Sequence, residues 1–171
     1  MNPTLYIETT IVSYLTARRT TDALRQAHQD LTRQWWDSHR LEFALYTSQF
    51  VLDEAADGDP TAAAERLSAL SGIDSLAIRP EIEPLALRLL EAGALPPSAR
   101  VDALHLAIAT VHRLRYLLTW NCKHLANAFL WRRIEETCHS AGYQPPTICT
   151  PLELMGADHE GFNRGTGSSD A

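Results

Sequence analysis

Short apolar runs alternate along this chain with segments in which apolar residues recur at helical spacing. The runs that predict strands lie at Leu5–Glu8, Phe43–Thr47 and Tyr116–Trp120, with a weaker one at Ser75–Ile78. The Tyr116–Trp120 run shows no polar alternation, as expected for a strand covered on both faces. Apolar strands separated by helices predict an α/β fold with a mainly parallel sheet of four to five strands.

Helices are predicted between these runs, where apolar positions repeat every three or four residues. Ser48 suits the N-cap position of the helix after the second strand, and Pro60 suits the first position of the next helix. The apolar spacing after Ala99 predicts one buried face that begins at Val101 and continues through Leu104, Ile108 and Val111. The longer predicted helices are Ala23–His39, Thr61–Leu70, Pro80–Ala92, Ala99–Arg113 and Leu130–Ala141.

The length of 171 residues predicts one domain with a sizeable core. No repeat or linker divides the chain, so we expect a single domain over residues 1–156. The remaining residues, 157–171, are rich in Gly, Ser and Asp, and this composition predicts a disordered tail. No apolar run approaches the roughly 20 residues that span a bilayer.

The composition favours a cytoplasmic protein. The N-terminus has no basic region ahead of its apolar run, which Glu8 interrupts, so a signal peptide is not expected. The cysteines Cys122, Cys138 and Cys149 are too few and too scattered for a disulfide framework, and we expect reduced thiols. A formal net charge of −6 argues against a protein that coats nucleic acid, although it allows a nuclease with a local basic rim.

Acidic and amide side chains follow the predicted strands or face the interior. Glu8 ends the first apolar run, and Asn121 lies just beyond "YLLT". Sites in open α/β sheets form beyond the carboxyl ends of strands. Glu54 shares a helix side with Phe50 and Val51, whereas Asp53 shares a side with Gln49 and is expected to be solvated. Asp102 opens an apolar helix and is predicted to be semi-buried.

Carboxylates that converge on one cleft repel each other unless a cation, a proton or a basic side chain intervenes. The oxygens of Glu8, Glu54 and Asp102, with the Asn121 amide, suit a hard cation such as Mg²⁺ or Mn²⁺. Each position also has a simpler interpretation. Asp102 would be an exposed first-turn acid, Glu54 a solvated acid, Glu8 the partner of an arginine, and Asn121 a turn residue.

The order "YIETT", "LDEAADG", "VDALHLAIA" and "YLLTWNCKHLAN" resembles the PIN-domain nucleases, particularly the VapC-type toxins of bacterial toxin–antitoxin systems. The resemblance runs from about Leu5 to about Met155. It implies a PIN-like three-layer α/β/α fold. It also implies an endoribonuclease that depends on Mg²⁺ or Mn²⁺, forms a homodimer and is inhibited by a small antitoxin.

Carried over position by position, the resemblance makes Glu8, Glu54 and Asp102 the metal ligands and adds Asn121 to the catalytic set. Thr9 and Thr10 match the hydroxyl residues that follow the first acid. Lys123 is a candidate for substrate phosphate, as are Arg18, Arg19 and Arg100. The chain departs from the family pattern at Glu8, where Asp is usual, and at Asn121, which is often acidic.

The acidic residues also suggest two other functions. The departures at Glu8 and Asn121 favour, as an alternative, a PIN-fold protein that is catalytically weak or inactive and serves as a protein- or RNA-binding module. A phosphatase with an Asp nucleophile after the first strand is excluded, because Glu8 and two threonines stand there. His105 could act as a general base, but a histidine within an apolar helix is more often a hydrogen-bonded packing residue.

Overall fold

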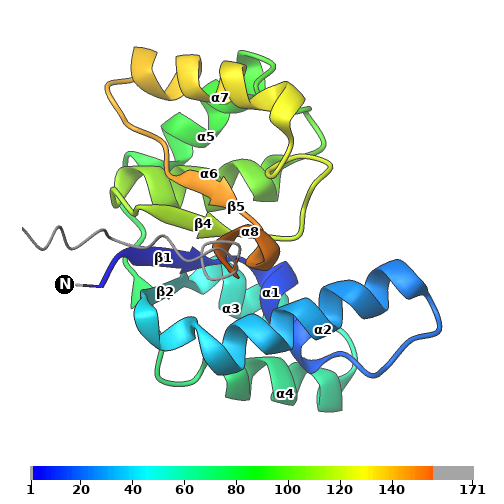
Figure 1. Cartoon of the computed structure of the whole chain (residues 1–171). Coiled ribbons are helices and arrows are strands. Elements are labelled where there is room, and N and C mark those ends of the chain that lie inside the picture. The colour runs from blue at the N-terminus through cyan, green and yellow to red at the C-terminus, as the bar shows by residue number, and fades with distance from the viewer. Residues whose placement is uncertain (1, 156–171) are drawn as a thin grey trace, which may run out of the picture.

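The computed structural model describes residues 2–155 as one α/β fold (Figure 1). The tail predicted at residues 157–171 lies outside this described part. One sheet of five strands runs through it in the order β3-β2-β1-β4-β5, and every pairing is parallel. This confirms the predicted fold class. The strands are β1 Thr4–Ile7, β2 Ala44–Ser48, β3 Asp74–Leu76, β4 Tyr116–Leu118 and β5 Thr147–Cys149.

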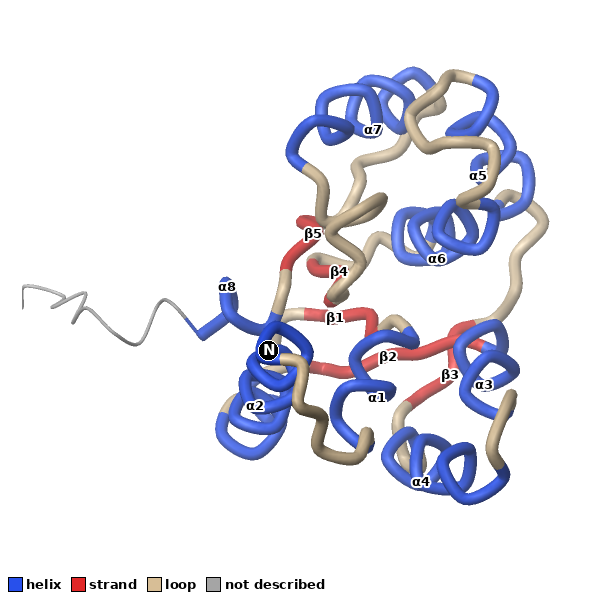
Figure 2. Tube along the Cα trace, turned by 90° about the vertical axis from the view of Figure 1, so that its right-hand side faces the viewer, coloured by secondary structure: helices blue, strands red, loops and turns tan. Residues whose placement is uncertain are grey.

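Helices cover both faces of the sheet. In Figure 2, α5, α6 and α7 lie on one side, and α1, α2 and α4 lie on the other. Helix α3 packs against α1 and α4. The helices are α1 Thr9–Thr16, α2 Ala23–Ser38, α3 Gln49–Ala56, α4 Pro60–Leu70, α5 Ile82–Glu91, α6 Arg100–Val111, α7 Ala128–Ser140 and α8 Pro151–Met155, with a short 3-10 turn at Arg40–Glu42.

The central strand β1 is apolar because both of its faces are covered. Leu5, Tyr6 and Ile7 have no exposed surface. Leu5 is in register with Leu45 of β2 and Tyr116 of β4, and Ile7 is in register with Leu118. Since the strands are parallel and in register, the residues that follow Ile7 and Leu118 emerge side by side at the carboxyl edge of the sheet.

Several predicted positions differ from those observed. Ser48 occupies the N-cap position of α3, but its side chain makes no capping bond, because its hydroxyl bonds Tyr6 instead. The prediction that Val101 faces the core is wrong: this residue is 44% exposed, and full burial in α6 begins at Ala103. The third strand lies at Asp74–Leu76, so Ile78 falls beyond it and is 52% exposed.

The helix termini carry the sequence signals expected of them. Pro60 occupies the first turn of α4, as predicted, and the Asp59 side chain before it accepts the Ala62 N–H at 2.9 Å. Asp22 caps α2 in the same way, through the Arg25 N–H. Cys122, Cys138 and Cys149 are all free thiols. Within residues 2–155, no helix combines the length and the apolar character that crossing a membrane requires.

Candidate active site

Glu8 stands where the central strand gives way to a helix. It follows β1, its N–H donates to the Leu118 carbonyl at 3.3 Å, and it is the N-cap of α1. Its Oε1 accepts the Thr10 N–H at 3.2 Å. Glu8 therefore satisfies a free N–H of the helix terminus while lying at the carboxyl edge of the sheet.

The Glu8 carboxylate is almost completely enclosed, with 4% of the residue exposed. Its Oε2 accepts from the Thr10 hydroxyl at 2.5 Å and from the Thr119 hydroxyl at 2.8 Å. Burial raises the pKa of Glu8, and the neighbouring charge of His105 and the threonine hydrogen bonds only partly offset this rise. The partners are threonines, so the alternative in which Glu8 pairs with an arginine is not what the structure contains.

Glu54 enters from α3 and keeps more contact with solvent, its side chain being 37% exposed. Both of its hydrogen bonds fall on Oε2, from the Thr9 hydroxyl at 2.6 Å and from His105 Nε2 at 2.7 Å. Burial opposes ionisation, but these bonds and the charge of His105 outweigh it, so the pKa of Glu54 is lowered. Asp53, in contrast, is exposed and bonds Gln49, as predicted from the helical spacing.

Asp102 lies in the first turn of α6, and its side chain is 16% exposed. Its two oxygens have separate partners, Asn121 Nδ2 at 2.8 Å and His124 Nδ1 at 2.7 Å. The Asn121 oxygen accepts the His124 N–H at 3.1 Å, within the turn after β4. Asp102 is therefore semi-buried, as predicted. Asn121, however, uses its oxygen inside the turn and presents its nitrogen to Asp102.

His105 is fully buried and connects the acids to the sheet. Its Nδ1 lies 2.9 Å from the Tyr6 hydroxyl, which in turn lies 2.7 Å from the Ser48 hydroxyl. The expectation of a hydrogen-bonded packing histidine is confirmed, but its partner is the site residue Glu54. Sequence reasoning did not identify Tyr6, Thr119 or His124 as members of the site.

Two hydrogen-bond networks contain the predicted residues, and they meet at the Glu8–Thr9 peptide bond. The Thr119 hydroxyl donates to Glu8 and accepts the Asn121 N–H at 2.9 Å, and Asn121 reaches Asp102. On the other side, Thr9 follows Glu8 directly and bonds Glu54. The structure therefore brings together all four residues of the predicted catalytic set, with Thr9 and Thr10 between them.

The candidate phosphate contacts are less closely tied to this network. Lys123 lies two residues after Asn121 and is exposed. Arg18 and Arg19 are also exposed, in the segment between α1 and α2. Arg100 precedes Asp102 by two positions, but its guanidinium approaches Glu83 at 3.5 Å.

The chemical type of the ligand atoms at this site suits a hard divalent cation. Glu8, Glu54 and Asp102 supply only carboxylate oxygens, which Mg²⁺ and Mn²⁺ prefer. The burial that raises the Glu8 pKa means that its negative charge is not fully compensated by the surrounding protein groups. Within residues 2–155, no three His, Cys, Asp or Glu side chains already form a group that could hold a metal ion.

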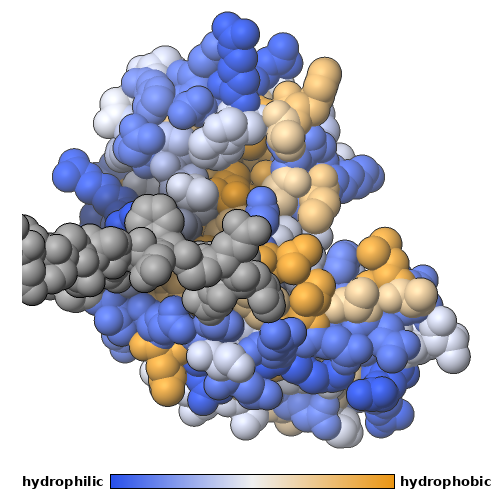
Figure 3. All heavy atoms as spheres, in the orientation of Figure 1, coloured by the Kyte–Doolittle hydropathy of each residue, from blue (hydrophilic) through white to orange (hydrophobic). Residues whose placement is uncertain are grey.

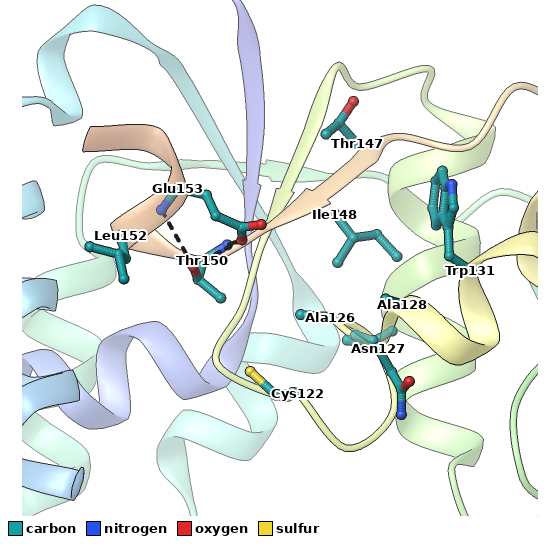
Figure 4. A pocket seen from close by; sticks show the side chains of 11 residues that line it. Cys122, Ala126, Asn127, Ala128, Trp131, Thr147, Ile148, Thr150, Leu152 and Glu153 are labelled. Carbon is teal, nitrogen blue, oxygen red and sulfur yellow. Dashed lines mark hydrogen bonds between the residues drawn. The ribbon is translucent and has the colours of Figure 1, made fainter. Parts of the chain in front are cut away.

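A separate apolar pocket of about 760 Å³ lies beside this site (Figure 4). It shares the segment after β4 with the site, through Cys122 and Asn127, but none of the three acids lines it. Glu153 at its margin bonds both the N–H and the hydroxyl of Thr150. In Figure 3, apolar side chains gather around the hollow between α7 and α2, where α8 lies. Among residues 2–155, Glu153 is the only charged residue that lines this pocket.

The polar groups that can perform chemistry therefore lie in the hydrogen-bonded set around Glu8, Glu54 and Asp102, at the ends of β1 and β4 and the starts of α1 and α6. No protein-family model matches this sequence, and no curated protein matches it either.

Proposed function

We propose that this protein is a metal-dependent endoribonuclease of the PIN type, acting as the toxin of a type II toxin–antitoxin module. The observation that carries the proposal is the convergence of Glu8, Glu54 and Asp102 on two adjoining hydrogen-bond networks. These acids come from three distant parts of the chain and lie at the carboxyl edge of a parallel sheet. Glu8 and Asp102 are joined through Thr119 and Asn121, and Glu54 bonds Thr9, the residue that follows Glu8. Such an edge is where α/β proteins bind ligands.

In this proposal Glu8, Glu54 and Asp102 hold one Mg²⁺ or Mn²⁺ ion. The cation, when bound, would make water a better nucleophile and offset the charge that develops on the scissile phosphate. Asn121 holds Asp102 through its amide nitrogen. Thr9 and Thr10 orient Glu54 and Glu8 through their hydroxyls. Lys123, exposed after Asn121, contacts the phosphate of the RNA.

The wider assignment follows from the family resemblance. The substrate is RNA with exposed, unpaired bases, since selective cleavage of RNA usually reads such bases. The partners are a small antitoxin and a second copy of this chain, in the cytoplasm. With Glu8 in place of Asp and Asn121 in place of an acid, the site carries three formal negative charges. This charge favours one tightly held metal, with a second arriving together with the substrate phosphate.

A second candidate is a PIN-fold module that binds protein or RNA with little or no catalysis. One specific observation favours it: the oxygens of Asp102 are both engaged by protein donors, and so are those of Glu8. A carboxylate that is saturated by internal donors has less to gain from a cation. The two candidates differ in whether the native protein gains stability from metal.

The deciding experiment combines metal binding with RNA cleavage. Mn²⁺ at about 100 times its dissociation constant should stabilise the wild type by about 2.7 kcal/mol. For a protein of this size each kcal/mol raises Tm by about 2–4 °C. The variant Asp102→Ala should lose this stabilisation, and Glu54→Gln should weaken it. Both variants should lose the RNA ends that sequencing detects after expression.

The matched control is Asp53→Asn, which changes the acid beside Glu54 on the solvated side of α3. It should behave as the wild type in both measurements. A wild type whose Tm does not respond to Mn²⁺, and whose toxicity Asp102→Ala leaves unchanged, would favour the binding module instead.

A further inference from the structure

The second acid of the site differs from the other two in how its oxygens are used. Glu54 Oε2 receives two donors, the Thr9 hydroxyl at 2.6 Å and His105 Nε2 at 2.7 Å. Both bonds fall on the same oxygen, and 37% of the side chain remains exposed. The carboxylate is therefore anchored through one oxygen, while Oε1 accepts neither of these bonds.

His105, which holds Glu54, is itself held by a contact at its other ring nitrogen. His105 is enclosed in α6, and its second ring nitrogen meets the Tyr6 hydroxyl at 2.9 Å. Tyr6 is fully buried in β1, and its hydroxyl also meets Ser48 at the end of β2. Two strands of the sheet thus hold the imidazole, and the imidazole holds Glu54. An orientation set in this way leaves the carboxylate little rotational freedom.

The hydrogen bonds that run from Ser48 through Tyr6 and His105 to Glu54 have a definite direction. A carboxylate oxygen can only accept, so the 2.7 Å contact between His105 Nε2 and Glu54 Oε2 requires a proton on Nε2. With the proton on Nε2, Nδ1 is left to accept, and the Tyr6 hydroxyl at 2.9 Å can donate to it. Ser48 then donates to the Tyr6 oxygen. The sheet therefore selects the imidazole tautomer that Glu54 requires.

We propose that Tyr6 and His105 are positioning residues, which fix Glu54 through Oε2 and so assign Oε1 as the oxygen offered to the cation. This inference rests on the proposed function for the identity of the ligand. It extends the proposed site to Tyr6 of β1 and His105 of α6, neither of which contacts the cation. The geometry also explains why an apolar helix contains a histidine at this position.

The first test needs no metal. In a long-range ¹H–¹⁵N NMR spectrum of the metal-free protein, His105 should carry a proton on Nε2. A ring protonated only on Nδ1 would overturn the proposal, because it could not donate to the Glu54 anion. Tyr6→Phe removes the hydroxyl but keeps the ring, and it should shift the two nitrogen resonances of His105.

The second test measures Mn²⁺ affinity by electron paramagnetic resonance. Removing a group that orients a metal ligand typically costs about 10- to 100-fold in affinity. His105→Leu should show a loss in this range, and Tyr6→Phe a smaller loss in the same direction. His105→Gln keeps an N–H donor and should recover part of the affinity.

A double-mutant cycle separates positioning from a general structural role. In a Glu54→Gln background, Tyr6→Phe and His105→Leu should no longer change Mn²⁺ affinity, because they act through the Glu54 anion. Equal losses in both backgrounds, or no loss in either, would overturn the proposal. If His105→Leu does not fold, Tyr6→Phe still decides the outcome.

The control variant is Thr110→Val. Thr110 is fully buried on the same helix and donates to the Leu106 carbonyl at 2.7 Å, but it contacts none of the acids. It should lower Tm and leave Mn²⁺ affinity unchanged. If the wild type binds no Mn²⁺ at all, the proposed function fails, while the NMR measurement still decides whether the Tyr6–His105 chain holds Glu54.

Discussion

At the scale of single residues, the three acids lie in different electrostatic environments although their hydrogen-bond networks adjoin. Glu8 is enclosed and its pKa is raised by burial, whereas Glu54 is partly exposed and its pKa is lowered by His105 and Thr9 against the effect of burial. The folded protein therefore disfavours the charged form of Glu8 and favours the charged form of Glu54. This difference makes Glu8 the acid whose replacement should affect stability most directly.

We predict that Glu8→Gln stabilises the metal-free protein at neutral pH. A pKa that is raised by folding contributes stability below the unfolded value, about 4.3, and this stability is lost as the pH rises through the folded value. Glutamine does not titrate, so its advantage over the wild type should grow with pH and vanish near about pH 4. Urea unfolding in EDTA across this range measures the difference.

The same substitution should abolish the stabilisation by Mn²⁺. Glu65→Gln, on the exposed side of α4, serves as the control and should leave the pH dependence of the wild type unchanged. A Glu8→Gln protein that is less stable than the wild type at every pH would show that the carboxylate contributes more through its threonine bonds than it costs through burial.

The sequence was sufficient to place the acids but not their partners. Helical spacing separated Glu54 from Asp53, and strand-end position identified Glu8 and Asn121. Thr119 could not be assigned to Glu8, because that contact depends on the register of two strands 111 residues apart. In the sequence, Tyr6 cannot be distinguished from an ordinary core aromatic residue. The contact of His124 with Asp102 depends on the turn in which the Asn121 oxygen accepts the His124 N–H, and the sequence does not show that turn.

At the scale of elements, α6 differs from the amphipathic helices around it. From Ala103 to Val111, Leu104 is its only partly buried residue, and the others are buried. The helix packs against α5 on the outside and contacts β4 on the inside. Periodicity predicted this helix as Ala99–Arg113, one residue too early at its start and two too late at its end, and it predicted one buried face that includes Val101. A helix enclosed on nearly all sides has no polar stripe from which the inward face can be read.

We expect Leu106→Ala to be among the more destabilising changes in the chain. Leu106 has no exposed surface, and removing a buried leucine side chain typically costs about 2–5 kcal/mol. Val101→Ala on the same helix should cost much less, because Val101 is 44% exposed. Equilibrium unfolding in urea compares the two. Similar costs for both variants would mean that α6 is not enclosed as described.

At the scale of the whole molecule, the charge balance limits how RNA can be held. The net charge is −6, and the candidate phosphate contacts are four cations, Lys123, Arg18, Arg19 and Arg100. A substrate with many phosphates would find few cations beside the site. The proposed nuclease should therefore hold RNA through a small number of phosphate contacts and depend on the bound metal for much of its affinity.

This charge balance predicts a shallow salt dependence of RNA binding. Each phosphate contact on single-stranded RNA contributes about 0.7 to the slope of log K against log salt. Lys123→Ala should lower the slope by about one such contact. Arg132→Ala is the control, since Arg132 pairs with Glu136 on the surface of α7. Fluorescence anisotropy in EDTA, where the RNA stays intact, gives both slopes. An unchanged slope in Lys123→Ala would exclude this lysine as a phosphate contact.

The position of β1 at the centre of the sheet has a consequence for synthesis of the chain. A ribosome makes Glu8 first, but its partner Thr119 comes 111 residues later, and at about 5–20 residues per second that is a delay of roughly 6–20 seconds. During this interval the Leu5–Ile7 run has no β4 beside it. A nascent chain therefore lacks the assembled candidate site, and its earliest apolar segment stays open to aggregation until β4 has been made.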